Sequence, residues 1–145
     1  MRIIKLPAVL IVLLGAVLLS GCGESEPKVA GRWYTQTQVD NGKQLFIDNC
    51  AKCHGVAAQG TPNWNKTGAD GKYPPPPLNG TAHAWHHPLA GLKRSVQHGG
   101  VPLGGSMPGF ADTLSDAETE AVISYYQNRW PAPIYQAWLD RGGLK

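Results

Sequence analysis

Two cysteines and a histidine stand within five residues of each other, in the stretch "CAKCH" from Cys50 to His54. In a helical turn, residues three apart share a face and the next residue projects close by. Cys50 and Cys53 can therefore both reach one edge of a flat ligand, while His54 is carried over its face. The C-x-x-C-H spacing is the attachment pattern of c-type haem. The stretch predicts one covalently bound haem, with His54 as an iron ligand.

The first 21 residues have the layout of an export signal. Arg2 and Lys5 precede an uncharged apolar run from Leu6 to Leu19, as in a secretory signal peptide. The run is 14 residues long, which is short of the roughly 20 residues that span a bilayer as a helix. We therefore expect a signal peptide over residues 1–21, with an uncleaved anchor as the weaker alternative.

The signal ends in "LSGC", from Leu19 to Cys22, which resembles the lipobox of bacterial lipoproteins. The resemblance implies cleavage before Cys22 and lipidation of its sulfur and new amino group. Several acyl chains would hold the protein firmly at a membrane surface. We expect a lipid-anchored protein of the bacterial envelope, on the periplasmic or outer side, with the choice of membrane left open. An ordinary signal peptide that ends near a cysteine is the alternative.

Three other kinds of site can use two closely spaced cysteines. A zinc site would need a fourth ligand, usually with zinc-knuckle spacing, and the sequence has no second C-x-x-C. A thioredoxin-like redox pair would follow a strand in a βαβ unit, and no such unit is visible. A plain disulfide is open to any exported protein. The motif and the export signal together favour the haem.

The net charge restricts the possible binding partners, and the number of cysteines restricts the possible disulfides. Without residues 1–21 the chain loses two of its 13 basic residues and keeps all 10 acidic ones, so its net charge is +1. Nucleic-acid binding rests on clustered positive charge, so this balance argues against a nucleic acid. With Cys22 assigned to lipid, no cysteine outside the motif is left for a structural disulfide.

The sequence divides into a tether, one domain and a tail. Residues 22–37 are polar and lack apolar periodicity, so they predict a tether between lipid and domain. Residues 38–133 carry the helical patterns of a single, mostly α domain with long loops. Residues 134–145 predict a tail with one or two weak turns. No segment has a convincing strand pattern.

Three helices are predicted in the domain. The first covers residues 39–54 and can be capped by Asp40 or Asn41. The second runs from about residue 89 to 97, where Gly99 and Gly100 stop it. The third starts at a capping box of Ser115 and Glu118 and extends to about residue 130. Glycine- and proline-rich loops join these helices.

Over about residues 39–130 the chain resembles the class I c-type cytochromes. In that family a glycine and an aromatic residue stand eight and four positions before the first haem cysteine, and Gly42 and Phe46 occupy these positions. The resemblance implies that the last helix crosses closely at Gly42, with Tyr125 or Tyr126 against it. It also implies the cytochrome c fold: mostly α, three or more helices and long loops around one covalent haem c.

Further cofactor contacts are implied by the same resemblance. In the family, a proline–leucine pair follows the motif, and the proline carbonyl accepts the proton on the far nitrogen of the ligand histidine. Pro77–Leu78 is the expected match, beyond an apparent insertion at residues 55–73. The family's axial methionine comes from a loop before the final helix, where this chain has Met107. A His/Met pair raises the reduction potential.

Met107 has rivals as the sixth ligand. It is the one methionine besides Met1, and its alternative role is packing in the core. A second histidine could also ligate the iron, and the candidates are His83, His86, His87 and His98. Three of these lie in "HAWHHP", for which we expect an ordered loop beside the haem, with a haem-propionate contact or a metal site as alternatives.

These expectations favour a one-electron carrier that docks with redox-partner proteins and is not an enzyme. With both axial positions filled, the iron has no open site for a substrate. Two alternatives are a small haem enzyme or haem subunit, such as a peroxidase, and a redox or gas sensor. The di-haem enzymes of this superfamily need a second motif, and a sensor needs an output module for which the chain has no room.

Overall fold

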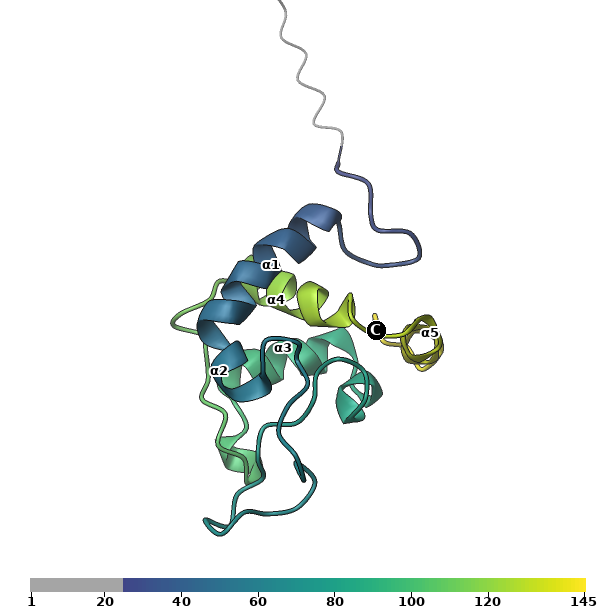
Figure 1. The fold of residues 1–145 in the computed structure, drawn as a ribbon. Coiled ribbons are helices and arrows are strands. Elements are labelled where there is room, and N and C mark those ends of the chain that lie inside the picture. Colours follow the sequence, from purple (N-terminus) through teal and green to yellow (C-terminus); the bar gives the residue numbers. More distant parts are fainter. Residues whose placement is uncertain (1–24) are drawn as a thin grey trace, which may run out of the picture.

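The computed structural model describes residues 25–145 of the chain. Within this part, five α-helices and two short 3-10 helices follow one another, and strand pairing is limited to two isolated bridges (Figure 1). The prediction of a mostly α fold with long loops is therefore confirmed. The predicted signal peptide at residues 1–21 and the predicted lipidation of Cys22 lie outside the described residues.

Two helices cross at the centre of the fold: α1 (Gln36–Asn49) and α4 (Asp116–Gln127). A Cβ atom at Gly42 would overlap the backbone carbonyl group of Ala121, so only glycine allows this approach. One turn further on, the rings of Phe46 and Tyr125 pack with centroids 5.2 Å apart. The predicted close crossing is confirmed, and Tyr125 is the aromatic residue that lies against α1.

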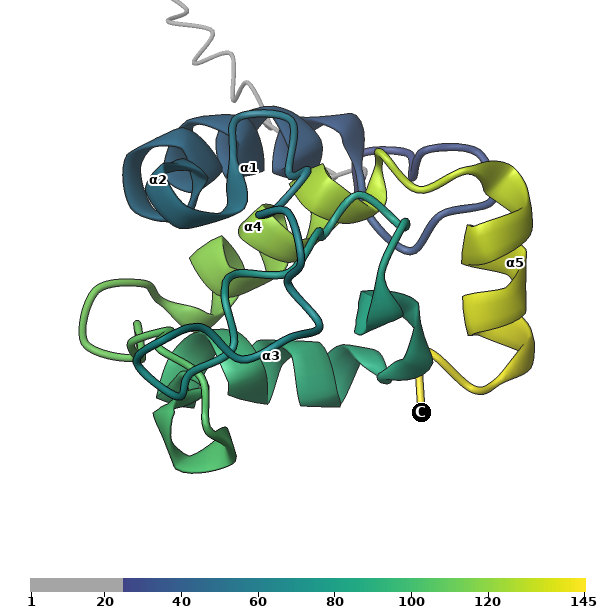
Figure 2. The same ribbon diagram turned by 60° about the horizontal axis from the view of Figure 1, so that its bottom comes forward.

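The remaining elements wrap around this pair. A short helix α2 (Ala51–His54) follows α1 directly, and η1 (His83–His86), α3 (Leu89–His98) and η2 (Val101–Leu103) come after the long loop. Helix α5 (Ala132–Asp140) closes the chain on the far side of α4 from α2 (Figure 2). In the described residues, no helix is both long and apolar enough to cross a bilayer.

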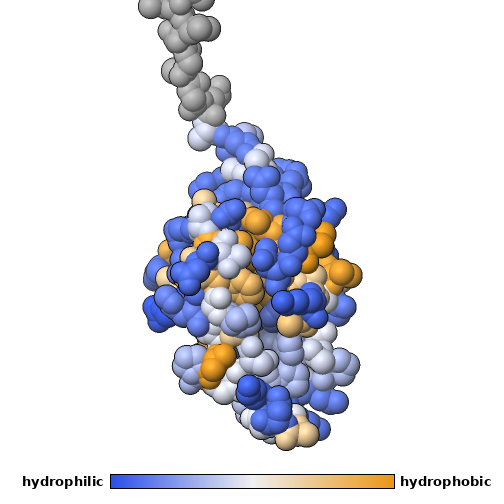
Figure 3. All heavy atoms as spheres, turned by 90° about the vertical axis from the view of Figure 1, so that its left-hand side faces the viewer, coloured by the Kyte–Doolittle hydropathy of each residue, from blue (hydrophilic) through white to orange (hydrophobic). Residues whose placement is uncertain are grey.

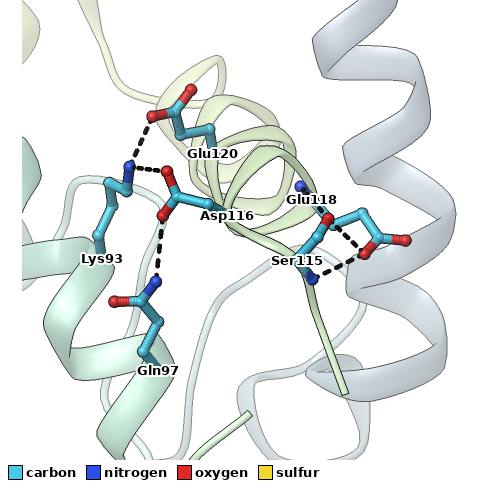
Figure 4. Close-up of polar contacts among 6 residues, drawn as sticks. All are labelled: Lys93, Gln97, Ser115, Asp116, Glu118 and Glu120. Carbon is cyan, nitrogen blue, oxygen red and sulfur yellow. Dashed lines mark hydrogen bonds and ion pairs between the residues drawn. The ribbon is translucent and has the colours of Figure 1, made fainter. Parts of the chain in front are cut away.

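Helix α3 is joined to α4 by a small polar cluster (Figure 4). The ammonium group of Lys93 lies 2.7 Å from a carboxylate oxygen of Asp116 and 2.7 Å from one of Glu120. At the start of α4, Ser115 and Glu118 form the predicted capping box, with hydrogen bonds in both directions. These contacts set the start of α4 against the side of α3.

The start of α1 differs from the prediction. Thr35 caps the helix and forms a capping box with Gln38, whereas Asp40 lies inside the helix and accepts a hydrogen bond from Gln36. Asp40 and Asn41 were therefore the wrong caps. The stretch "TQTQ" satisfies the S/T-x-x-E/Q pattern and lengthens the helix at its N-terminus by one turn.

The C-terminal tail is also more regular than predicted. In place of one or two weak turns, α5 places Tyr135 and Trp138 on one buried face, where their rings pack 5.2 Å apart and against Trp130. Residues three apart share a helix face, so the tertiary contact with Trp130 stabilises a helix whose own periodicity is too short to identify.

Part of the predicted tether folds onto the domain. We call residues 28–35 the N-terminal strap. Its Tyr34 is fully buried, and Trp33 donates through its indole nitrogen to the side chain of Gln127 at 2.6 Å. Arg32 donates to the backbone carbonyl of Trp130 at 3.3 Å and lies 3.9 Å above the ring of Tyr135. The strap thus ties the end of α4 to α5.

Candidate haem site

The C-x-x-C-H motif lies at the junction of α1 and α2. The amide of Cys50 donates to the carbonyl of Phe46, and the amide of His54 donates to the carbonyl of Cys50, so the helical path continues through the motif. Both cysteines are free thiols; Cys50 is buried and Cys53 is exposed. One sulfur therefore faces the core and the other lies at the surface, as two attachment points at the edge of a large group require.

The sulfur of Cys50 occupies an apolar place. Burial, and in second place the neighbouring Cys53, raise the pKa of the Cys50 thiol to about 11. A thiolate is therefore strongly disfavoured there. A thioether carries no charge, so covalent attachment of a haem vinyl group suits this position. The same apolar surroundings bury Tyr126, and burial raises the pKa of its phenol too.

A hydrogen bond holds His54 in the tautomer that can ligate a metal ion through Nε2. Its Nδ1 lies 2.8 Å from the backbone carbonyl oxygen of Pro76, and because a carbonyl can only accept, Nδ1 carries the proton. The lone pair on Nε2 is then free for a metal ion. Burial lowers the pKa of His54 although the hydrogen bond to Pro76 acts in the opposite sense, so the ring stays neutral, as a ligand must.

The partner of His54 was predicted one residue too late. The acceptor is Pro76 and not Pro77, because two contacts fix the register of the proline run. The amide of Leu78 donates to the carbonyl of Ala58 at 2.8 Å, and that of Thr61 donates to Pro75 at 2.9 Å. Four consecutive prolines give the sequence no signal to distinguish one carbonyl from the next.

Leu78 joins this segment to the rest of the site. Its side chain is half-buried against the core, and its backbone carbonyl accepts the indole N–H of Trp130 at 2.8 Å. The carbonyl that orients His54 is thus two residues from a backbone group that Trp130, in the turn between α4 and α5, holds in place. A contact of Pro77 or Leu78 with the cofactor itself stays a prediction.

Met107 lies in a tightly folded loop between η2 and α4. The amide of Gly100 donates to its backbone carbonyl at 3.0 Å, and a Cβ atom at Gly99 would lie only 2.5 Å from that oxygen. The Met107 side chain is half-buried against the core. A parallel bridge between Tyr73 and Gly105 joins this loop to the loop that carries Pro76. Ligation by the Met107 sulfur stays a prediction.

The histidines of "HAWHHP" lie on and beside η1 with their side chains exposed. His83 packs on Trp64 with ring centroids 5.2 Å apart, and His87 meets its ring edge-on at 5.8 Å. Among residues 25–145, no group of three or more His, Cys, Asp or Glu side chains is placed to hold a metal ion. These ring contacts fit the predicted ordered loop, and its position beside the haem stays a prediction.

The residues present fit a covalent haem. They provide one buried and one exposed thiol, a neutral imidazole with a free Nε2, and apolar rings around the buried sulfur. Exposed apolar side chains also occur on the surface, among them Val56, Val101 and Leu103. Figure 3 shows that apolar side chains form separate areas among polar ones on the face it presents.

Comparison with known proteins gives one family. Residues 37–125 match the family described as cytochrome c oxidase, cbb3-type, subunit III. Among curated relatives, a thiosulfate dehydrogenase of Psychrobacter arcticus is 33% identical over 68% of this chain. A cbb3-type cytochrome c oxidase subunit FixP of Sinorhizobium medicae is 29% identical over 81% of this chain, and a nitrite reductase of Stutzerimonas stutzeri is 29% identical over 76%.

These relatives are much longer than this chain. The matched part covers 28% of the thiosulfate dehydrogenase, 39% of the FixP subunit and 19% of the nitrite reductase. No solved structure gives a significant match. The resemblance to these relatives therefore concerns only a part of each of them.

Proposed function

The chain belongs to the cbb3-type cytochrome c oxidase subunit III family and is a class I c-type cytochrome, and from this premise we propose that it is a one-electron carrier of the bacterial envelope. The family implies haem-based electron transfer and one covalent haem c. The finer assignments that follow, the axial pair, the role as a carrier and the membrane anchor, are parts of the proposal.

In the proposal, Cys50 and Cys53 hold the haem and His54 and Met107 ligate its iron. The haem supplies a metal centre that changes its charge by one electron. The observation that carries the proposal is the hydrogen bond from His54 Nδ1 to Pro76, which fixes the ring with Nε2 free. Support for Met107 comes from its compact loop, which a bridge at Gly105 joins to the proline loop. Because these two loops are joined, we expect both axial ligands to keep their positions when the iron changes its oxidation state.

The role as a carrier is tested by an optical redox titration of the purified holoprotein. We expect a single one-electron transition, a methionine–iron charge-transfer band in the oxidised form, and no rapid binding of carbon monoxide to the reduced form. Rapid binding of carbon monoxide at neutral pH would contradict the proposal, because it requires an open or easily displaced axial position.

The assignment of Met107 has its own test. In Met107→Ala the charge-transfer band should disappear, and the potential should fall by an appreciable part of the roughly 0.8 V range that axial ligands span, because a thioether favours the reduced iron. The matched control is Met107→Leu, which keeps the apolar volume and should behave like the alanine variant. An unchanged potential in both variants would exclude Met107 as a ligand.

A second candidate function is that of a small haem enzyme, in which this haem domain itself catalyses the reaction. The names of two relatives, thiosulfate dehydrogenase and nitrite reductase, favour it. Steady-state assays of the holoprotein with thiosulfate and with nitrite distinguish the candidates. A carrier should turn over neither substrate unless a separate enzyme is added, whereas catalysis by the chain alone would support the enzyme.

The proposal includes a lipid anchor at Cys22, with residues 1–21 removed. It rests on the sequence pattern alone. We expect mass spectrometry to find a lipidated N-terminal cysteine and the membrane fraction to hold the protein, while Cys22→Ser should release it or block its processing. The same haem spectrum in the released form would separate anchoring from cofactor binding. Partners are then redox proteins that dock on an almost neutral surface through exposed apolar side chains such as Val56 and Leu103.

A further inference from the structure

A shallow cavity lies between η1 and the end of α5. Its volume is about 240 Å³, and its walls include the rings of Trp85 and Trp138. Figure 2 shows the end of the chain passing beside η1 and the start of α3. Sites for drug-sized ligands span roughly 300–1,000 Å³, so this cavity suits one small group. None of the proposed haem ligands lines it.

The ionisable side chains that line this cavity are all basic. Four basic side chains border it, and no acidic side chain does; they belong to His86, His87, Arg141 and Lys145. Within the part of the chain that the structure describes, the only ion pairs are those between α3 and α4, and none of these four residues takes part in them. Asp140, the nearest acidic residue in sequence, is hydrogen-bonded within α5. The cationic side chains of Arg141 and Lys145 therefore border the cavity without an ion pair to an acidic side chain.

The walls of the cavity are fixed by contacts between distant segments. The indole N–H of Trp138 donates to the carbonyl of His87 at 2.8 Å. The amide of Leu89, at the start of α3, donates to the carbonyl of Gly143 at 2.7 Å. A Cβ atom at Gly143 would overlap the ring of Trp138. The basic side chains therefore extend from a backbone that is already in place, which lowers the entropic cost of binding a ligand.

The guanidinium group of Arg141 is also held in place by a neighbouring side chain. Its guanidinium group lies 5.0 Å from the centroid of the Trp85 ring, in a cation–π contact. Stacking uses the face of the guanidinium plane and leaves the N–H groups at its edge available. In the described part of the chain, these N–H groups have no hydrogen-bond acceptor and no carboxylate partner.

We propose that the cavity between η1 and α5 binds a small soluble oxyanion, of the carboxylate or phosphate class. The fork of Arg141 matches the two oxygens of such a group, Lys145 adds a second positive charge, and the imidazoles of His86 and His87 can donate further hydrogen bonds. The site does not depend on the electron-carrier role proposed above, because its residues are separate from the haem ligands.

The test uses the reduced holoprotein, labelled with ¹⁵N and titrated at constant ionic strength with inorganic phosphate and, separately, with acetate. We expect the indole signals of Trp85 and Trp138 to shift saturably with at least one of the two anions. The signals of Trp33 and Trp64, which do not line the cavity, should stay in place. Because the haem is bound, a cavity already filled by a haem propionate would give no response and would overturn the proposal.

Two variants and a control locate the site. Arg141→Gln should raise the dissociation constant roughly tenfold or more, since a charge-assisted bidentate contact is lost, and Lys145→Gln should raise it by a smaller factor. Arg94→Gln removes an exposed cation of α3 that does not line the cavity and should leave binding unchanged. Equal weakening by Arg94→Gln, or no weakening by either cavity variant, would show only general attraction of anions to the protein.

Discussion

Gly42 shows how one residue sets the distance between two helices. Any side chain at this position would enter the backbone of α4 at Ala121, and neither helix can move away without separating Phe46 from Tyr125. Gly42 lies eight residues before Cys50 in the sequence, which is about two helical turns before the C-x-x-C-H motif. The glycine therefore sets the position of the motif relative to α4 through the contact between the two helices.

The first prediction concerns this glycine. Gly42→Ala should lower the free energy of unfolding by about 3 kcal/mol, at the upper end of the range for overpacked cores, as measured by guanidinium denaturation of the holoprotein. Gly91→Ala is the matched control. A Cβ atom there meets only ordinary contacts at 3.5 Å or more, so this helical substitution should be neutral or stabilise by up to about 1 kcal/mol. Similar losses in both variants would contradict the crossing.

At the scale of single residues, the sequence allowed some assignments and left others undetermined. Gly42 and Phe46 could be predicted through the resemblance to the class I c-type cytochromes, whose spacing of these two residues from the first haem cysteine this chain shares. The acceptor of His54 could not, because Pro76 lies 22 residues further along and its register depends on hydrogen bonds between loop backbones. Backbone contacts of this kind leave no trace in residue type.

Lys93 links two helices through charge. Its side chain is 20% exposed, and those of its partners Asp116 and Glu120 are 66% and 32% exposed, so water screens the pairs in part. The hydrogen bonds to the two carboxylates raise the pKa of Lys93 above its usual 10.5. A raised pKa means that folding favours the protonated amine, so this contribution to stability is present at neutral pH and is lost as the pH rises through the raised pKa.

The second prediction follows from that sign. Lys93→Gln should cost about 1 kcal/mol of unfolding free energy at pH 7, as expected for a pair of partly exposed ion pairs. The difference from the unmodified protein should shrink as the pH rises above about 10.5, the ordinary pKa of lysine, and through the raised pKa of Lys93 in the folded protein. The control is Lys43→Gln, an exposed residue of α1 without an ion pair in the described part of the chain, which should change little at any pH. A loss that persists at alkaline pH would indicate packing and not charge.

For whole elements, local sequence signals predict that a helix exists more reliably than they predict where it begins and ends. The S-x-x-E box at Ser115 marks the start of α4, and the equivalent T-x-x-Q box at Thr35, not the predicted Asp40 or Asn41, marks the start of α1. Helix α5 could not be found from its own residues, because only Tyr135 and Trp138 mark its buried face. Its surroundings, which come from Trp130, the strap and the segment beside η1, decide that it is helical.

The N-terminal strap extends the molecule beyond the matched family region, which begins at residue 37. Tyr34 is fully buried, and Trp33 and Arg32 contact residues that are more than 90 positions away in the chain. Such distant contacts have no signature in a polar segment of sixteen residues, which the sequence predicted to be a tether. The strap therefore contributes to the core of the domain.

The third prediction tests this role. A variant whose mature chain starts at residue 36 should lose at least about 3 kcal/mol of unfolding free energy relative to one that starts at residue 27, since removal of a buried aromatic side chain alone costs about 3–5 kcal/mol. Both should carry haem with the same spectrum. Tyr34→Ala in the longer form should reproduce most of the loss. Equal thermal stability of the two forms would mean that the strap only rests on the surface.

If Cys22 carries the lipid anchor that we propose, the strap would also limit the distance between the haem and the membrane. Six peptide bonds separate Cys22, where we propose the lipid, from Lys28, so this segment can extend by at most roughly 20 Å. A tether that continued to residue 37 could extend by roughly 50 Å. Helix α1, whose 14 residues span about 21 Å, separates the strap from Cys50. The haem would thus stay within about 40 Å of the bilayer. Membrane-bound partners would therefore meet it at a high local concentration, whereas soluble partners would have to diffuse to the membrane surface.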